Sequence, residues 1–154
     1  MPVHDFDVAI IGAGIAGASV GYALAGRKRV LMLERESQPG YHTTGRSAAM
    51  FIETYGNADV RALTRASAPF FAATPVGFSP TPLTTRRGEL AIGRADQAAS
   101  LDRAFSVGRS LNSQIRRVTA AEARAMVPAL RPEAVAGAVL VPNASDIDVN
   151  ALHR

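Results

Sequence analysis

The chain has 154 residues, which is enough for one ordinary domain or for parts of two. Its 47% hydrophobic and 19% charged residues predict a soluble globular protein and exclude an intrinsically disordered one. The net charge of +4 comes from scattered arginines, without the concentrated basic surface and interleaved aromatic residues of a nucleic-acid-binding protein. No nucleic-acid partner is therefore expected.

Metal and disulfide chemistry are not expected either. The chain has no cysteine, which excludes disulfides, thiolate zinc sites and a cysteine nucleophile. The three histidines, His4, His42 and His153, lie far apart and lack the spacing of metal ligands. An uncharged run over residues 8–26 follows acidic rather than basic residues and is interrupted by glycines, which is untypical of a signal peptide or a membrane span. A cytoplasmic location is predicted.

The first elements in the chain form a recognisable order. Residues 7–11 are a short β-branched apolar run, typical of a strand buried on both faces. The sequence GAGIAG follows over residues 12–17 and opens a helical pattern that Gly26 should end. Residues 30–33 predict a second buried strand, which ends in Glu34. This order indicates a Rossmann-like βαβ unit in an α/β fold.

Each part of this unit has a physical task in binding a dinucleotide. Gly12 permits the tight turn, Gly14 lets the backbone approach a pyrophosphate, and Gly17 lets the helix pack closely. The helix N-terminus offers free N–H groups to the phosphates. Glu34 is placed to accept hydrogen bonds from a ribose diol, which argues against a 2′-phosphate, although the adjacent Arg35 weakens that argument. The unit alone does not separate FAD from NAD.

The later elements are predicted from periodicity and capping residues. The first is a helix capped by Asn57 with an apolar face of Val60, Leu63 and Phe70 or Phe71, which Pro69 should end or kink. A loop over 74–85, a strand over 90–92 and a helix over 96–111 follow, with Leu101, Phe105 and Leu111 of that helix facing inward. The last elements are a short helix opened by a capping box at Thr119–Glu122, a strand over 138–141 and a helix over 146–154. The pair Asp146 and Asp148 is interpreted as helix capping rather than acid–base catalysis.

A family resemblance depends on the segment after the second strand. Residues 41–51 read YHTTGRSAAMF, a stretch of small residues, hydroxyls and one arginine without an amphipathic period. Together with Glu34–Glu36 and Tyr55–Gly56, it resembles the D-amino-acid oxidase/dehydrogenase superfamily of FAD flavoproteins, most closely the D-arginine dehydrogenases. Gly88–Leu90 and DIDxxALH at Asp146–His153 extend the resemblance over most of the chain.

The resemblance implies a fold and an activity. Residues 1–56 would form the N-terminal part of the FAD-binding domain, residues 57–142 part of an α+β substrate domain, and residues 143–154 a helix returning to the FAD domain. The implied reaction is oxidation of the CH–NH2 group of a D-amino acid by hydride transfer to flavin N5. The imino acid formed is then hydrolysed to a 2-oxo acid.

The resemblance also assigns residues. Tyr55 and Glu89 would contact the substrate, with the Glu89 carboxylate paired to a cationic side chain. Met50 stands where the D-arginine dehydrogenases are expected to have a histidine, so a titratable group is lost beside the flavin. A helix beginning near Ser47 would add anion-binding N–H groups. No catalytic residue is assigned. The implied FAD contacts are Gly12, Gly14, Ile15, Ala16, Gly17, Glu34, Arg35, Thr43, Thr44, Gly45, Arg46, Ser47, Ala48, Ala49 and Met50.

Alternatives remain open at this point. A sarcosine- or glycine-oxidase-like substrate would follow if Glu89 faces solvent. Because chains of the family are longer, this chain could be a non-catalytic dinucleotide-binding fragment or a subunit of a heteromer. A parallel sheet of two strands would leave apolar edges exposed, so a completing chain or self-association is expected. The residues do not separate an oxidase from a dehydrogenase.

Overall fold

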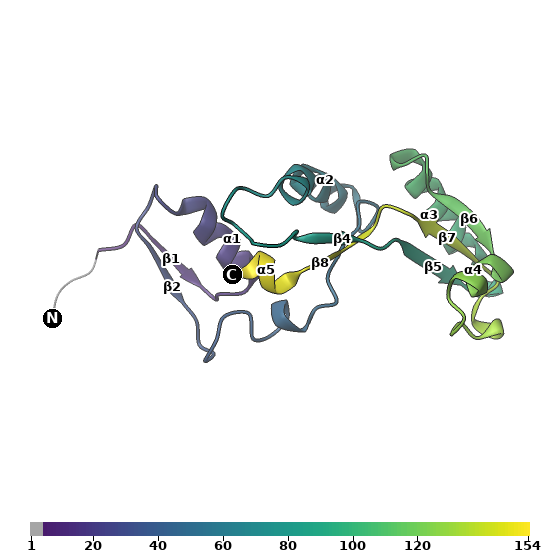
Figure 1. The fold of residues 1–154 in the computed structure, drawn as a ribbon, viewed down its shortest axis with the longest axis horizontal. Coiled ribbons are helices and arrows are strands. Elements are labelled where there is room, and N and C mark those ends of the chain that lie inside the picture. The colour runs from purple at the N-terminus through teal and green to yellow at the C-terminus, as the bar shows by residue number, and fades with distance from the viewer. Residues whose placement is uncertain (1–4) are drawn as a thin grey trace. The chain divides into compact units, whose positions relative to one another are not determined.

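The computed structural model describes residues 5–154, which divide into two compact units (Figure 1). The first unit contains the chain up to Ala49 together with Ser79–Leu83 and Asp148–Arg154. The second unit contains Met50–Phe78 and Thr84–Ile147. The assignment of residues 1–56, 57–142 and 143–154 to cofactor and substrate domains remains a prediction.

The first unit contains the predicted βαβ arrangement. Strand β1 (Val8–Ile11) and strand β2 (Val30–Leu33) are parallel, and helix α1 (Ile15–Leu24) connects them and packs on both. The helix ends as predicted, because Gly26 follows it with a φ of +76°, a conformation that glycine adopts without strain. A 3-10 turn, η1 (Thr44–Arg46), and a short helix, α5 (Val149–His153), complete the unit.

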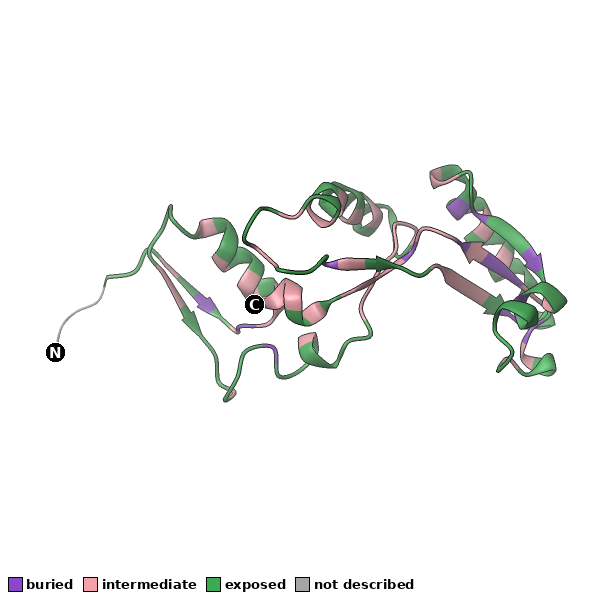
Figure 2. Ribbon diagram, in the orientation of Figure 1, coloured by how far each residue is buried: buried purple, intermediate pink, exposed green. Residues whose placement is uncertain are grey.

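The prediction that β1 is buried on both faces is wrong for the described chain. Ile10 is buried, whereas Ile11 is 89% exposed and Leu33 at the end of β2 is 50% exposed. Figure 2 shows the same for α1, which has no buried residue. The physical reason is that two strands and one helix bury only the side chains that lie between them, and β1 and β2 have no third strand beside them.

The second unit is built on two antiparallel sheets. In one, β7 (Gly137–Val141) lies between β5 (Glu89–Gly93) and β6 (Arg116–Thr119). In the other, β8 (Ser145–Ile147) lies between β3 (Met50–Phe51) and β4 (Thr84–Arg86). The helices of this unit are α2 (Ala58–Ala72), α3 (Ala98–Leu111) and α4 (Ala120–Met126), with 3-10 turns η2 (Ala95–Gln97) and η3 (Pro132–Ala134).

Strand β7 supplies the centre of the hydrophobic core. Val139 and Val141 pack with Ile115 in one cluster, against which Leu101 and Phe105 of α3 also pack. Both α3 residues pack inward as predicted, and Leu101, Phe105 and Leu111 are all partly buried. A second cluster is formed by Val118, Ala123, Val135 and Ala138. The capping box that opens α4 is confirmed, since the Thr119 hydroxyl accepts the Glu122 N–H at 3.2 Å and the Glu122 carboxylate accepts the Thr119 N–H at 2.7 Å.

Helix α2 was predicted to end or kink at Pro69, and the structure shows that it does not end there. The helix continues through this proline to Ala72, although Asn57 caps its start as predicted. Aromatic contacts of the residues after the proline explain why the last turn persists: Phe71 lies 5.1 Å from Phe51 and Phe70 lies 5.1 Å from Phe78, measured between ring centroids. The expected apolar face is incompletely covered, because Val60 and Leu63 are exposed.

The sequence also misplaced several short elements. Strand β4 begins at Thr84, inside the predicted loop, and β3 and β6 were not predicted. Asp146 does not cap a helix but lies in β8, where its carboxylate pairs with Arg87 at 2.7 Å. Asp148 caps α5 as predicted by accepting the Ala151 N–H. These strands are two to four residues long, too short for the period of an isolated strand to be visible.

Over residues 5–154, the structure has no helix of the length and hydrophobicity needed to cross a lipid bilayer.

The core of the second unit gives a stability prediction. Ile115 is fully buried, so Ile115→Ala should lower the free energy of unfolding by about 2–5 kcal/mol, and Ile115→Val by about 1 kcal/mol. Urea unfolding followed by circular dichroism measures both. Val76→Ala, at a fully exposed position, is the matched control and should stay within about 0.5 kcal/mol of wild type. Equal losses in Ile115→Ala and Val76→Ala would contradict the described core.

Candidate functional site

The glycine loop, residues Gly12–Gly17, turns sharply from β1 into α1. Gly12 has a φ of +95°, and its N–H donates to the Leu33 carbonyl at 2.7 Å, which ties the turn to β2. A Cβ on Gly17 would lie 2.0 Å from the Gly12 carbonyl oxygen. Only glycine allows this separation, so the start of α1 is held directly against the end of β1.

The loop presents unused donors. The N–H groups of Gly14, Ala16 and Gly17 have no hydrogen-bond acceptor within residues 5–154. The Ile15 N–H differs, because it donates to the Thr44 hydroxyl at 3.0 Å. A Cβ on Gly14 would lie 3.2 Å from that hydroxyl oxygen. The helix N-terminus is thus open to an anionic group, and Thr44 lies beside it.

Glu34 lies at the end of β2 next to this loop. Its Oε2 accepts the Ala13 N–H at 2.8 Å, and its Oε1 accepts the N–H groups of Arg35 at 2.7 Å and Glu36 at 3.0 Å. These bonds, above all those from Glu36 and Ala13, lower the pKa of Glu34 below its ordinary value. The carboxylate is therefore ionised at neutral pH and retains lone pairs that can accept hydrogen bonds from hydroxyl groups. Arg35 points away to pair with Glu36 at 2.9 Å and is largely exposed.

The predicted helix start near Ser47 is wrong. Residues Thr44–Arg46 form a single 3-10 turn, and Ser47 is extended, with φ −84° and ψ 137°. Local hydrogen bonds explain the difference: the Gly45 N–H donates to the Gly40 carbonyl at 2.7 Å, and the Ser47 hydroxyl donates to the Thr43 carbonyl. The Ser47 region therefore offers no helix N-terminus to an anion.

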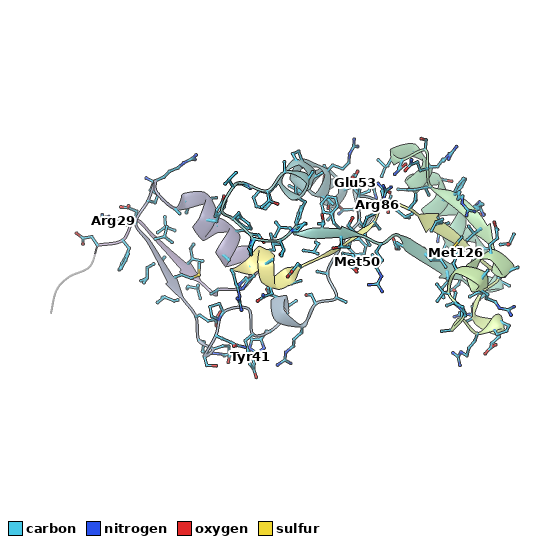
Figure 3. The ribbon with its side chains drawn as sticks, in the orientation of Figure 1. Arg29, Tyr41, Met50, Glu53, Arg86 and Met126 are labelled. Carbon is cyan, nitrogen blue, oxygen red and sulfur yellow. The ribbon has the colours of Figure 1, made fainter. Side chains whose placement is uncertain are left out.

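The predicted residues from Arg46 onward have different surroundings, and Figure 3 labels Met50, which lies in β3. The Arg46 guanidinium lies 5.2 Å from the centre of the Tyr41 ring, a cation–π distance. Ala48 is exposed and Ala49 is partly buried at the end of the first unit's segment. Met50 begins β3, pairs with Asp146 and packs against the Ile115 cluster of the second unit.

The two predicted substrate residues share a cavity within the second unit. The cavity has a volume of about 300 Å³ and is lined by residues that include Ile52, Tyr55, Arg61, Glu89, Arg103 and Val139. Tyr55 is 72% exposed, and Glu89, the first residue of β5, is half-buried. The Glu89 carboxylate has no hydrogen bond or ion pair with any residue of the described range 5–154, and its burial raises its pKa.

Two arginines of this cavity were not predicted. Arg61 of α2 donates to the Gly56 carbonyl, and Arg103 of α3 donates to the Ser100 hydroxyl at 2.9 Å. Helical periodicity places them on α2 and α3, but the sequence carries no signal that α2 and α3 line one cavity. Within the described residues, no group of His, Asp and Glu side chains is arranged to hold a metal ion.

Comparison with known proteins identifies the class. The family described as FAD dependent oxidoreductase (DAO) matches residues 7–154, and the chain belongs to this family. FAD is its cofactor. The observed site fits that cofactor: a glycine turn that a Cβ would obstruct, unpaired amides at a helix N-terminus and an ionised carboxylate at the end of β2.

Individual relatives support the same class. The chain is 26% identical to a glycine oxidase of Geobacillus kaustophilus over 90% of its length and 39% of that protein. A crystal structure of glycine oxidase from G. kaustophilus superposes with a TM-score of 0.83 at 24% identity, covering 98% of this chain and 43% of that one. An iminodiacetate oxidase of Chelativorans sp. BNC1 gives a TM-score of 0.69 at 25% identity, with coverages of 95% and 42%. The chain thus spans about two fifths of the length of these relatives.

The raised pKa of Glu89 predicts a pH dependence of stability. A carboxyl whose folded pKa exceeds its ordinary value binds protons more tightly in the folded state. The contribution of Glu89 to the stability of the folded state is therefore most favourable below the ordinary pKa of 4.5. This contribution declines as the pH rises from 4.5 through the raised pKa. Glu89→Gln should remove this decline, so that the variant gains stability relative to wild type between pH 3 and 7.

Urea unfolding at a series of pH values measures this difference. Glu133→Gln, at an exposed position of the same unit, is the matched control and should show no comparable gain. A Glu89→Gln variant that is as pH-dependent as wild type would contradict the burial of this carboxyl.

Proposed function

We propose that this chain provides the cofactor cradle and part of the substrate site of an FAD-dependent oxidoreductase that oxidises the CH–NH2 group of a basic D-amino acid such as D-arginine. The observation that carries the substrate proposal is Glu89, a half-buried carboxylate without a protein partner in a cavity shared with Tyr55.

The chemistry of Glu89 favours a cationic group. Removing a carboxylate from water without a partner is unfavourable, and a guanidinium or ammonium group placed beside it restores the lost interactions. A guanidinium matches the two carboxylate oxygens with two parallel hydrogen bonds. The cavity of about 300 Å³ is large enough for a side chain of that size. Tyr55 supplies an amphipathic ring that covers the aliphatic part of such a side chain.

Each part of the cradle has a proposed task. The N–H groups of Gly14, Ala16 and Gly17 bind the pyrophosphate, and Glu34 accepts the ribose hydroxyls. When bound, FAD supplies the acceptor for the hydride that leaves the substrate Cα. The remaining proposed cofactor contacts come from the turn and the extended segment that follow β2: Arg35, Thr43, Thr44, Gly45, Arg46, Ser47, Ala48, Ala49 and Met50.

A second substrate class is favoured by the two arginines of the same cavity. Arg61 and Arg103 bring positive charge into the lining and oppose a cationic ligand, whereas they suit a carboxylate. The similarity to a glycine oxidase points in the same direction. The alternative proposal is therefore a glycine- or sarcosine-like amino acid, with Glu89 bound to its ammonium group.

A third proposal concerns assembly. The exposure of Ile11 and Leu33 in the two-stranded sheet favours a completing chain, or self-association through this sheet, so that the chain would act as an FAD-binding subunit. Sedimentation of the purified chain would detect such association.

Cofactor binding is tested on the purified chain. We expect added FAD to remain bound through desalting, seen as flavin absorption in the visible range. Gly14→Val should weaken binding at least about tenfold, because its side chain would meet the Thr44 hydroxyl and cover the open amides. Gly137→Ala, in strand β7 of the second unit, is the control and should leave affinity unchanged, because a Cβ there would make only ordinary contacts, the nearest at 3.7 Å. Equal affinity of Gly14→Val and wild type would contradict the cradle.

Substrate class is tested by anaerobic reduction of bound flavin, on the chain and on any longer protein that contains it. D-Arginine should reduce wild type, and Glu89→Gln should lower kcat/KM for D-arginine by about 10- to 100-fold, since a charged hydrogen bond is lost. Reduction by glycine but not by D-arginine would establish the alternative substrate. Glu53→Gln, a substitution outside the residues that line the cavity, is the control.

A further inference from the structure

The backbone of Ala13, in the middle of the glycine loop, is held from three directions. Its N–H donates to Glu34 at 2.8 Å, as described above. Its carbonyl oxygen lies 2.8 Å from Nε2 of His153 and 3.1 Å from the N–H nitrogen of Gly40. Because a carbonyl oxygen only accepts, His153 carries a proton on Nε2 and donates it. Both lone pairs of the Ala13 oxygen are therefore used, and Ala13 itself is 3% exposed.

His153 reaches this oxygen from the opposite end of the sequence. It is the last residue of α5, whose start is fixed by the Asp148 cap. Its imidazole lies directly against Gly40: a Cβ on that glycine would be 2.9 Å from the ring carbon Cε1. Gly40 also has a φ of +71° and accepts the Gly45 N–H of the turn that carries Thr44. The ring thus contacts the glycine loop and the base of the Thr44 turn together.

We infer that His153 is a positioning residue of the cofactor cradle, which fixes the peptide of Ala13 so that the neighbouring Gly14 N–H stays open to the pyrophosphate of FAD. The inference rests on the proposed cradle. The physical argument is that the peptide that joins Ala13 to Gly14 includes both the oxygen held by His153 and the Gly14 N–H. Because the peptide is planar, fixing its oxygen also fixes the direction of its N–H.

Two substitutions separate the hydrogen bond from the packing of the ring. His153→Phe keeps a planar ring against Gly40 and removes the donor. His153→Gln replaces the ring but has an N–H donor at a similar reach from Cβ. We expect His153→Phe to raise the dissociation constant for FAD about tenfold and His153→Gln to restore at least half of the loss, since one hydrogen bond is at stake.

A second readout does not depend on FAD. Amide hydrogen exchange of the unliganded chain should be about tenfold faster at Ala13 and Gly40, whose N–H groups are hydrogen-bonded, in His153→Phe than in wild type, with strand β7 of the second unit unchanged. A general loss of folding would instead accelerate exchange in β7 as well. If wild type fails to bind FAD, the proposed cradle is wrong, while exchange at Ala13 and Gly40 still decides whether His153 orders the loop.

Three outcomes would overturn the inference. Exchange in His153→Phe that matches wild type at Ala13 and Gly40 would show that the hydrogen bond does not order the loop. Equal losses in His153→Phe and His153→Gln would assign the effect to ring packing instead of the donated proton. Faster exchange in the loop with unchanged FAD affinity would show that the ordered peptide is not used to bind the cofactor.

Discussion

The contact between Gly17 and the carbonyl of Gly12 is the constraint on which the first unit depends. A hydrogen atom in place of a side chain lets α1 begin directly above the end of β1, so the free amides of the helix and the carboxylate at the end of β2 face the same small volume. A larger residue at position 17 would also disturb β2 and α5, because the loop is hydrogen-bonded to Leu33 of β2 and to His153 of α5. The proposed binding of the cofactor at this loop depends on backbone geometry more than on any reactive side chain.

In the second unit, the fold keeps the Glu89 carboxylate partly out of water. Glu89 is the first residue of β5, paired with Val141 of the central strand β7, and the apolar packing beneath β7 fixes that strand. The rigid sheet therefore sets the depth of the carboxyl, while the more exposed Tyr55 lies on the loop before α2. Rigid placement of the charged group and greater exposure of the aromatic one suit the proposed substrate site, which would admit and release a small molecule.

Sequence reasoning succeeded where one local pattern determined one structure. The glycine loop, Glu34 at the end of β2, and the capping residues Asn57, Thr119 and Asp148 were all predicted, since each depends on neighbours in the chain. It failed where the cause was distant. The exposure of Ile11 depends on how many strands share its sheet, and the persistence of α2 beyond Pro69 depends on phenylalanines outside the helix. The cavity with Arg61 and Arg103 requires two helices to meet, which no single period encodes.

The first unit is assembled from three separate stretches of chain, the last of which is Asp148–Arg154. During synthesis, the βαβ segment leaves the ribosome long before α5 exists, so the bond from His153 to Ala13 forms only after the whole second unit has emerged. The first unit therefore cannot complete its folding before the second unit has been synthesised, although N-terminal domains usually fold first. Until α5 has been synthesised, the nascent glycine loop lacks the hydrogen bond from His153.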